Sequence, residues 1–320
     1  MTGYIEQAFK GYTDWWRYLL GLFFVFFIWQ IGATIQFGVV IYELVQQGFT
    51  LDRAMLKASD MSVLMGTLES NLNFFLLLLG FAFGFAAMWF VVRFFHNLKF
   101  KFFITSREKV DWSRIFFGAF VIGAVLLFST LLDVWLSPDD YQLNFKLDNF
   151  IILVIIGIIM VPIQTTFEEL LFRGYFMQGL GSIFRSRAVA LILSSTLFGL
   201  LHIANPEVAK LGYQALIVYI GTGFFFGIMT LMDEGMELAI GFHAANNLLT
   251  ALLVTADWTA FDTHSIFRYL GEPSVIGNIY IPVFIIYPII LLILAKKYKW
   301  NNWKQRLFGK VTPPLVETES

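Results

Sequence analysis

Three groups of polar residues interrupt the apolar segments of this chain, and their side chains are of the kinds used in acid–base chemistry. A charge at the centre of a bilayer costs about 2.5–3.5 kcal/mol on insertion scales, so intramembrane residues of this kind are candidate functional residues. The groups are Glu-Glu-x-x-x-Arg (Glu168, Glu169, Arg173), Phe-x-x-x-His (Phe198, His202) and His-x-x-x-Asn (His243, Asn247).

The first group combines a paired and an unpaired carboxylate. On a helix, Glu169 and Arg173 are four residues apart and share a face, where they can form an ion pair. Glu168 is rotated by about 100° from Glu169 and faces elsewhere. A free, partly desolvated carboxylate suits a general base. The alternative is a charge cluster at a helix end, whose side chains reach out to the membrane interface.

The two histidine groups could supply hydrogen-bonding partners to that base. His243 and Asn247 are four residues apart, so both side chains can point at one spot and form an oxyanion hole. The alternative for this group is a polar patch that holds helices together. Phe198 and His202 also share a helix face. A single membrane histidine often makes only a helix–helix hydrogen bond, which is the alternative for His202.

Residues 165–203 are interpreted as two helices joined near 182–187. An antiparallel hairpin centred on residue 185 places position 168 opposite position 202, so Glu168 and His202 are predicted to meet. The helix over 237–255 must then pack against this hairpin. His96 and His264 fall in connecting segments and are expected to be solvated, with no role. Asp133 is interpreted as a structural or gating charge near the outer surface.

The composition requires these groups to be positioned by membrane helices. Of the 320 residues, 58% are apolar and 14% are charged, against about 25% charged in a soluble domain. The mean hydropathy is +0.71. These values exclude a soluble enzyme and a disordered chain, and the net charge of −1 excludes a nucleic-acid binder. Without cysteine, the chain has no disulfide, thiolate metal site or cysteine nucleophile.

We predict an all-α, polytopic membrane helix bundle, with residues 1–320 forming one integral membrane domain. A spanning helix needs about 20 mostly apolar residues. The segment 46–71 is interpreted as a short surface helix flanking the active-site entrance, and 311–320 as a disordered tail. Eight spans are predicted, over 18–45, 72–95, 115–136, a fourth segment beginning near 149, 188–203, 213–232, 237–255 and 276–295.

Lysine and arginine predict the orientation of the bundle. With eight spans and a cytoplasmic N-terminus, 17 of the 22 Lys and Arg residues fall in cytoplasmic segments and 5 fall outside. Cytoplasmic loops carry an excess of these residues. Both termini are therefore predicted to be cytoplasmic.

Taken in order, the three motifs resemble the CAAX prenyl protease and bacteriocin-processing (CPBP or Abi) family of intramembrane endopeptidases. The resemblance covers about 150–255, the expected catalytic core. It implies that Glu168 activates water, that His202 orients this water or shares its proton, and that His243 and Asn247 stabilise the oxyanion. It also implies supporting roles for Glu169, Arg173 and Phe198.

The resemblance also carries expectations about cofactor and partners. No cofactor is expected, since asparagine is a poor zinc ligand. The alternative is Zn²⁺ held by Glu168, His202 and His243. The expected partners are a membrane-associated peptide or protein substrate and the lipid bilayer, with no nucleic acid. The oligomeric state is not predicted. Eukaryotic relatives cut the last three residues from prenylated CAAX proteins, whereas this compact chain resembles a prokaryotic member in the cytoplasmic membrane.

Two other classes of function use the same residues. A proton-coupled carrier could employ Glu168 and the histidines as a relay, but the sequence shows no inverted repeat. A non-enzymatic scaffold or bacteriocin-immunity protein could keep the fold without catalysis, but all three motifs are intact. The intramembrane endopeptidase is the leading hypothesis.

Overall fold

The computed structural model describes residues 3–313, and long apolar helices dominate it. Such helices form because every backbone polar group in a bilayer must be bonded within the protein. This finding confirms a helical integral membrane protein. Six helical segments of the described residues are long and apolar enough to cross a membrane: Trp15–Gln46, Ser70–Phe95, Trp112–Leu136, Leu147–Phe184, Ala215–Asp233 and Ile276–Tyr298.

Two of the eight predicted spans are shorter helices. Helix α9 (Arg187–Leu200) has 14 residues and α12 (Glu237–Leu253) has 17. At 1.5 Å per residue they measure about 21 and about 26 Å, less than the roughly 30 Å of a hydrocarbon core. All eight predicted helices are present, but the number that crosses the membrane stays a prediction.

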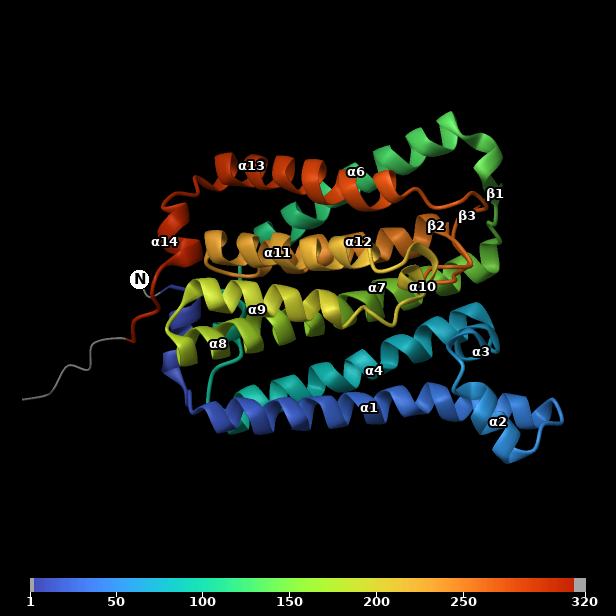
Figure 1. The fold of residues 1–320 in the computed structure, drawn as a ribbon, viewed down its shortest axis with the longest axis horizontal. Helices are drawn as coiled ribbons and strands as arrows, with labels where there is room; N and C mark the ends of the chain where they lie inside the picture. Colours follow the sequence, from blue (N-terminus) through green and yellow to red (C-terminus); the bar gives the residue numbers. More distant parts are fainter. Residues whose placement is uncertain (1–2, 314–320) are drawn as a thin grey trace, which may run out of the picture.

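The helices run along one long axis and reverse direction from one to the next (Figure 1). The start of the chain and α14 (Trp303–Phe308) lie at the same end of the bundle, with α5 (Lys101–Ile104) and the 3₁₀ helix Ile5–Lys10. The helices α2 (Leu51–Ala58), α3 (Met61–Gly66) and α10 (Pro206–Leu211) lie at the opposite end. The first and last helices of the described residues therefore lie on one side, whereas the assignment of that side to the cytoplasm rests on the Lys and Arg distribution.

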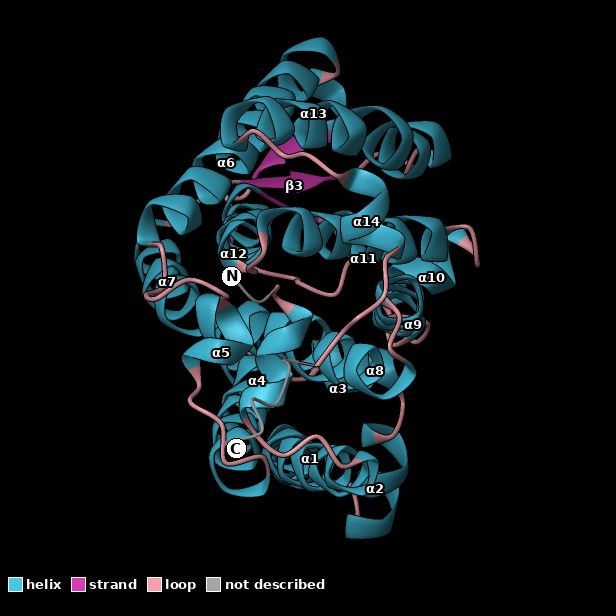
Figure 2. Ribbon diagram, turned by 90° about the vertical axis from the view of Figure 1, so that its left-hand side faces the viewer, coloured by secondary structure: helices cyan, strands magenta, loops and turns pink. Residues whose placement is uncertain are grey.

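The end-on view shows how the helices are layered (Figure 2). Helix α12 is central and packs against α6 (Trp112–Leu136), α7 (Leu147–Glu169) and α11 (Ala215–Asp233). On one side, α7 packs on α4 (Ser70–Phe90), which pairs with α1 (Trp15–Gln46). On the other side, α13 (Tyr287–Tyr298) covers α11. Helix α7, which carries the two glutamates, and helix α12, which carries the His-x-x-x-Asn motif, are therefore neighbours inside the bundle.

A small sheet departs from the all-α prediction. Strands β1 (Tyr141–Leu143), β3 (Phe267–Tyr269) and β2 (Val254–Thr255) lie side by side in that order. β1 is antiparallel and β2 parallel to β3. The sheet ties together loops at the end opposite the chain start. Strands of two or three residues are too short to produce a readable alternation of polar and apolar residues.

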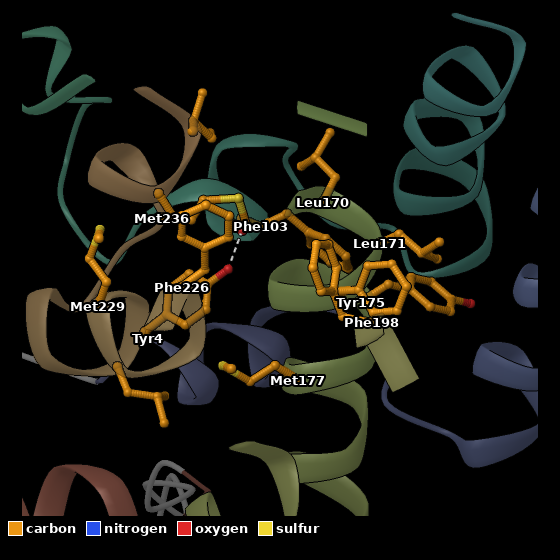
Figure 3. Close-up of a cluster of buried hydrophobic side chains, with 14 of the residues drawn as sticks. Tyr4, Phe103, Leu170, Leu171, Tyr175, Met177, Phe198, Phe226, Met229 and Met236 are labelled. Atoms are coloured by element: carbon orange, nitrogen blue, oxygen red, sulfur yellow. Dashed lines mark hydrogen bonds between the residues drawn. The ribbon is translucent and has the colours of Figure 1, made fainter. Parts of the chain in front are cut away.

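The apolar residues divide into a buried set and an outward-facing set. Phe116, Phe120 and Phe128 on α6 are about 70% exposed, as suits side chains that face lipid tails. Inside, large side chains from several elements meet around α7 and α11, including Tyr4, Phe198 and Phe226 (Figure 3). A soluble protein rarely exposes a continuous apolar surface of this kind.

The predicted hairpin is present, and one contact near its tip agrees with the predicted register. α7 passes through a π-helical stretch, Leu170–Phe176, into α8 (Met177–Phe184). Arg185 adopts a left-handed conformation with φ of 54° and reverses the chain into α9. The rings of Phe172 and Phe198 meet edge to face, 5.1 Å apart. This pairing corresponds to a hairpin centred on residue 185.

Two glycines allow α9 and α11 to approach closely. A Cβ atom on Gly223 would lie 2.3 Å from the Ser195 carbonyl oxygen, and one on Gly199 would lie 2.6 Å from the Ile220 nitrogen. Side chains at these positions would force the backbones apart. The crossing therefore needs glycine, as is common where membrane helices pack.

Candidate active site

The candidate site lies where α7 meets α12, near the middle of the bundle. Phe167, which precedes the two glutamates, packs edge to face on Trp29 with ring centroids 5.6 Å apart. Trp29 lies close to the midpoint of the 32-residue helix α1. The acidic pair is therefore deep within the long axis of the protein. α7 bears Pro162 just before this level, and the π-helical stretch follows just after it. Such stretches occur frequently at functional sites.

Glu169 and Arg173 form the predicted ion pair. An Arg173 Nη atom lies 3.0 Å from Glu169 Oε1, and the two side chains are 1% and 0% exposed. The guanidinium also donates to the carbonyl oxygen of Gly223 at 3.1 Å. It lies over the rings of Phe198 and Phe226. Gly223, which allows α9 and α11 to pack closely, therefore also supplies a backbone acceptor for Arg173.

His243 connects the two glutamates. Its Nδ1 lies 2.8 Å from Glu169 Oε1, and its Nε2 lies 3.7 Å from Glu168 Oε2. A carboxylate paired with a guanidinium can only accept hydrogen bonds, so Nδ1 of His243 carries the donated hydrogen. Nε2 therefore faces Glu168. A carboxylate that orients an imidazole in this way is a common feature of catalytic and metal-binding histidines.

Glu168 is 8% exposed, and the prediction that it lacks a partner is wrong. Gln164 Nε2 donates to Glu168 Oε1 at 2.6 Å. Gln164 Oε1 in turn accepts from Asn247 Nδ2 at 3.3 Å, and Asn246 donates to Asn247 Oδ1 at 3.1 Å. The motif analysis missed Gln164. Its signal was a polar residue inside an apolar span, one helical turn before Glu168.

The structure does not bring His202 to the glutamates. α9 ends at Leu200, so His202 lies in the following turn and does not continue the register of the hairpin. Its Nδ1–H donates to the Phe198 carbonyl oxygen at 2.8 Å, and its ring stacks on Tyr219 with centroids 4.4 Å apart. The ring of Phe198 does reach the site, 6.1 Å from that of His243.

The alternative zinc set does not assemble in this arrangement. Within residues 3–313, no three or more His, Asp or Glu side chains are grouped so that they could hold a metal ion. The His202 ring stacks on Tyr219, and its Nδ1 donates to the Phe198 carbonyl oxygen. These three side chains therefore do not fit a zinc ion in this arrangement, and the expectation that no metal is needed stays a prediction.

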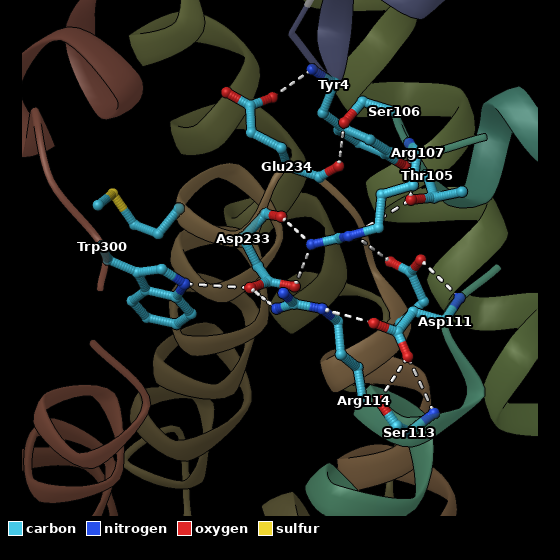
Figure 4. A network of polar contacts seen from close by, with 12 residues as sticks. Tyr4, Thr105, Ser106, Arg107, Asp111, Ser113, Arg114, Asp233, Glu234 and Trp300 are labelled. Carbon is cyan, nitrogen blue, oxygen red and sulfur yellow. Dashed lines mark hydrogen bonds and ion pairs between the residues drawn. The ribbon is translucent and has the colours of Figure 1, made fainter. Parts of the chain in front are cut away.

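A second polar network fixes the start of α12, and the sequence analysis did not predict it (Figure 4). Arg107 donates to Asp233 and to Glu237, each at 2.9 Å. Arg114 pairs with Asp233, which also accepts from the Trp300 indole at 3.1 Å. The network ties the loop before α6, the α11–α12 turn and the C-terminal segment together. It anchors α12 about 9 Å, or six residues, from His243.

Three predictions outside the site have different outcomes. The prediction that His96 is solvated is wrong, because His96 is 1% exposed and contacts the Tyr12 carbonyl and the Tyr175 hydroxyl. Asp133 accepts a hydrogen bond from the Tyr141 hydroxyl, which supports a structural role. The predicted tail mostly lies outside the described residues, although Val311 is buried and donates to the Arg185 carbonyl oxygen.

Comparison with known proteins agrees with the motif-based resemblance. Residues 148–249 match the family model described as type II CAAX prenyl endopeptidase Rce1-like. The uncharacterized protein YyaK of Bacillus subtilis (strain 168) is 29% identical over 259 residues, which cover 80% of this chain and 83% of that protein. No solved structure matches the chain significantly.

Proposed function

Since residues 148–249 carry the signature of the Rce1-like, type II CAAX prenyl endopeptidase family, we propose that this protein is an intramembrane endopeptidase that uses Glu168 as its general base. The family is one of membrane proteases, which supports peptide hydrolysis as the reaction class. The assignment of individual catalytic residues follows the motif-based resemblance and the geometry of the site.

One observation carries the assignment of the base. Glu168 Oε2 and His243 Nε2 face each other at 3.7 Å, too far apart for a direct hydrogen bond. A water molecule that bridges them at about 2.8 Å from each atom would lie to one side of the line that joins the two atoms. By contrast, Glu169 is fully buried and already bonded to Arg173 and His243. Glu168 is therefore the carboxylate of the pair that can hold and activate a nucleophilic water.

In the proposed reaction, Glu168 takes a proton from this water while the water oxygen bonds to the carbonyl carbon of the scissile peptide. An Asn247 amide hydrogen and the imidazole of His243 stabilise the resulting oxyanion. His243 can donate from Nε2 when both ring nitrogens carry hydrogen. The carbon–nitrogen bond then breaks, and Glu168 returns its proton to the leaving amine. Glu169 and Arg173 keep His243 in place.

His202 keeps its proposed assisting role, but this role requires a change in the turn that follows α9. Its Nδ1–H is donated to Phe198, so the lone pair of Nε2 is free to accept a proton or a water hydrogen. Because the turn lies beyond the regular helix, substrate binding could bring His202 closer to Glu168. His202 and Glu168 are therefore tested separately.

We further propose that the substrate is a membrane-associated peptide or protein, cut near its C-terminus or membrane region in the prokaryotic cytoplasmic membrane, without a metal cofactor. Support comes from the depth of the site, close to the level of Trp29. A substrate segment must enter the bundle from the bilayer or its interface to reach that depth. The relative YyaK from a bacterium agrees with this location.

The test is a cleavage assay of the purified full chain in detergent, with membrane-anchored peptides with and without prenyl groups. Glu168→Gln and His243→Ala should each abolish cleavage, and His202→Ala should reduce it. The matched control Glu108→Gln changes an exposed carboxylate and should cleave normally. A chelator should have no effect.

Three results would overturn the proposal. Cleavage that persists in Glu168→Gln would exclude this residue as the base. Loss of cleavage on chelation, with recovery on adding zinc, would establish a metal mechanism. Wild-type protein that cleaves none of the peptides, while Glu168→Gln alters proton-coupled flux in vesicles, would indicate a carrier.

A further inference from the structure

We propose that Gln164 is a positioning residue that holds the Glu168 carboxylate in the orientation needed to activate water. This inference rests on the proposed function, and it assigns a role to a residue outside the three motifs. Gln164 lies on α7, one helical turn before Glu168, and is 4% exposed.

Both ends of the Gln164 amide form hydrogen bonds. A primary amide buried in an apolar environment is costly unless it is hydrogen-bonded. Its Nε2 donates to Glu168 Oε1 at 2.6 Å, and its Oε1 accepts from Asn247 Nδ2 at 3.3 Å. The charged Glu168 carboxylate can only accept, so it requires the Gln164 nitrogen and leaves the Gln164 oxygen to accept from Asn247. The amide is therefore held between Glu168 on α7 and Asn247 on α12.

The two carboxylate oxygens of Glu168 have different partners. With Oε1 held by Gln164, the carboxylate cannot rotate freely, and Oε2 is directed to the space beside His243 Nε2. A hydrogen bond donated to a carboxylate also favours its charged form, which is the form that accepts a proton. Gln164 thus fixes the direction of the base.

Hydrogen bonds through Gln164 also link the base to the proposed oxyanion site. Asn247 uses one Nδ2 hydrogen for Gln164 and keeps a second for the substrate. A chain of hydrogen bonds therefore joins Asn247, Gln164 and Glu168. Because this chain crosses from α12 to α7, it sets the position of the oxyanion donor relative to the base.

The alternative is that Gln164 merely holds α7 and α12 together. Gln36 on α1 provides a matched control, because it is also 4% exposed and its amide also forms a hydrogen bond with a neighbouring helix, donating to Asn73 Oδ1 at 2.7 Å. Among the described residues, Gln36 forms no hydrogen bond with Glu168. Methionine has a similar length and no hydrogen-bonding amide, so Gln164→Met and Gln36→Met remove comparable contacts.

Two measurements on the full chain in detergent separate these possibilities. The first is cleavage kinetics. Gln164→Met should lower kcat by about 10–100-fold, as for the loss of an orienting partner, with KM changed less than about twofold. The second is labelling of Glu168 by dicyclohexylcarbodiimide, which reacts with protonated membrane carboxyls, quantified by peptide mass spectrometry across pH. In Gln164→Met the labelling of Glu168 should extend to higher pH than in the wild type.

Gln36→Met should leave both kcat and the labelling profile as in the wild type. Equal effects of the two substitutions, or an unchanged labelling profile in Gln164→Met, would overturn the inference. The labelling does not depend on turnover. If the wild type cleaves nothing but Gln164→Met still shifts the labelling of Glu168, the positioning role holds and the protease proposal fails.

Discussion

Replacing Arg173 by Met is predicted to destabilise the bundle by about 3–5 kcal/mol, the range measured when one partner of a buried ion pair is removed. Arg173 and Glu169 are 1% and 0% exposed, so water cannot replace the lost partner. The substitution leaves Glu169 with His243 as its remaining partner on Oε1, while Glu169 Oε2 already has none. An uncompensated buried carboxylate is the main cost.

The individual contributions agree with this range. A hydrogen bond to a charged group contributes about 1.5–3 kcal/mol, and Arg173 donates one to Glu169 and another to the Gly223 carbonyl. Its position over the rings of Phe198 and Phe226 adds about 0.5–2 kcal/mol. Methionine regains part of the apolar packing, about 1.5–3 kcal/mol. The net loss stays at a few kcal/mol.

The assay is equilibrium unfolding of the purified full chain in mixed micelles, followed by circular dichroism. The double variant Glu169→Gln with Arg173→Met removes the unpaired charge and should recover at least about 2 kcal/mol of the loss, a coupling typical of residues in direct contact. As a control, Arg268→Met breaks an ion pair with Asp262 that is partly exposed. This change should cost less than about 1 kcal/mol. The reasoning is refuted if Arg173→Met costs no more than Arg268→Met, or if the double variant recovers nothing.

Three further predictions concern the packing, the pH dependence and the second network. Gly223→Ala should lower both stability and cleavage, because its Cβ would meet the Ser195 carbonyl and displace the Gly223 oxygen from Arg173; unchanged unfolding would contradict this. Burial lowers the pKa of His96, and the nearby Arg17 guanidinium adds to this shift. The unfolded chain then binds a proton that the folded chain does not, so stability present above about pH 6.5 is lost as pH falls below it. His96→Gln should flatten this slope in unfolding measurements between about pH 5 and 7.5, and an unchanged slope would exclude His96 as its source. Glu237→Gln should weaken the bond from Arg107 and increase hydrogen exchange at the start of α12, whereas exchange as slow as in the wild type would show that this network does not anchor the helix.

The sequence alone determined the class of protein and most of the candidate site. Apolar runs of about 20 residues can satisfy their backbone only as helices in a bilayer, which is why the helices were readable from composition. The pairing of Glu169 with Arg173 was readable because helix geometry places residues four apart on one face. The pairing of Phe172 with Phe198 followed from the position of the turn, because a hairpin centred on residue 185 places these two residues opposite each other.

Only the tertiary structure decided which groups meet across different helices. His243 lies between both glutamates because the packing of α12 on α7 sets its rotation and depth, which no local spacing encodes. The spacing of four residues on α7 places Gln164 beside Glu168, whereas only the packing of α12 brings Asn247 to the Gln164 amide oxygen. His202 contacts Phe198 and Tyr219 in place of Glu168, and the contact with Tyr219 depends on how α9 packs on α11. Spacing along one helix is local geometry, whereas these contacts depend on how separate helices pack.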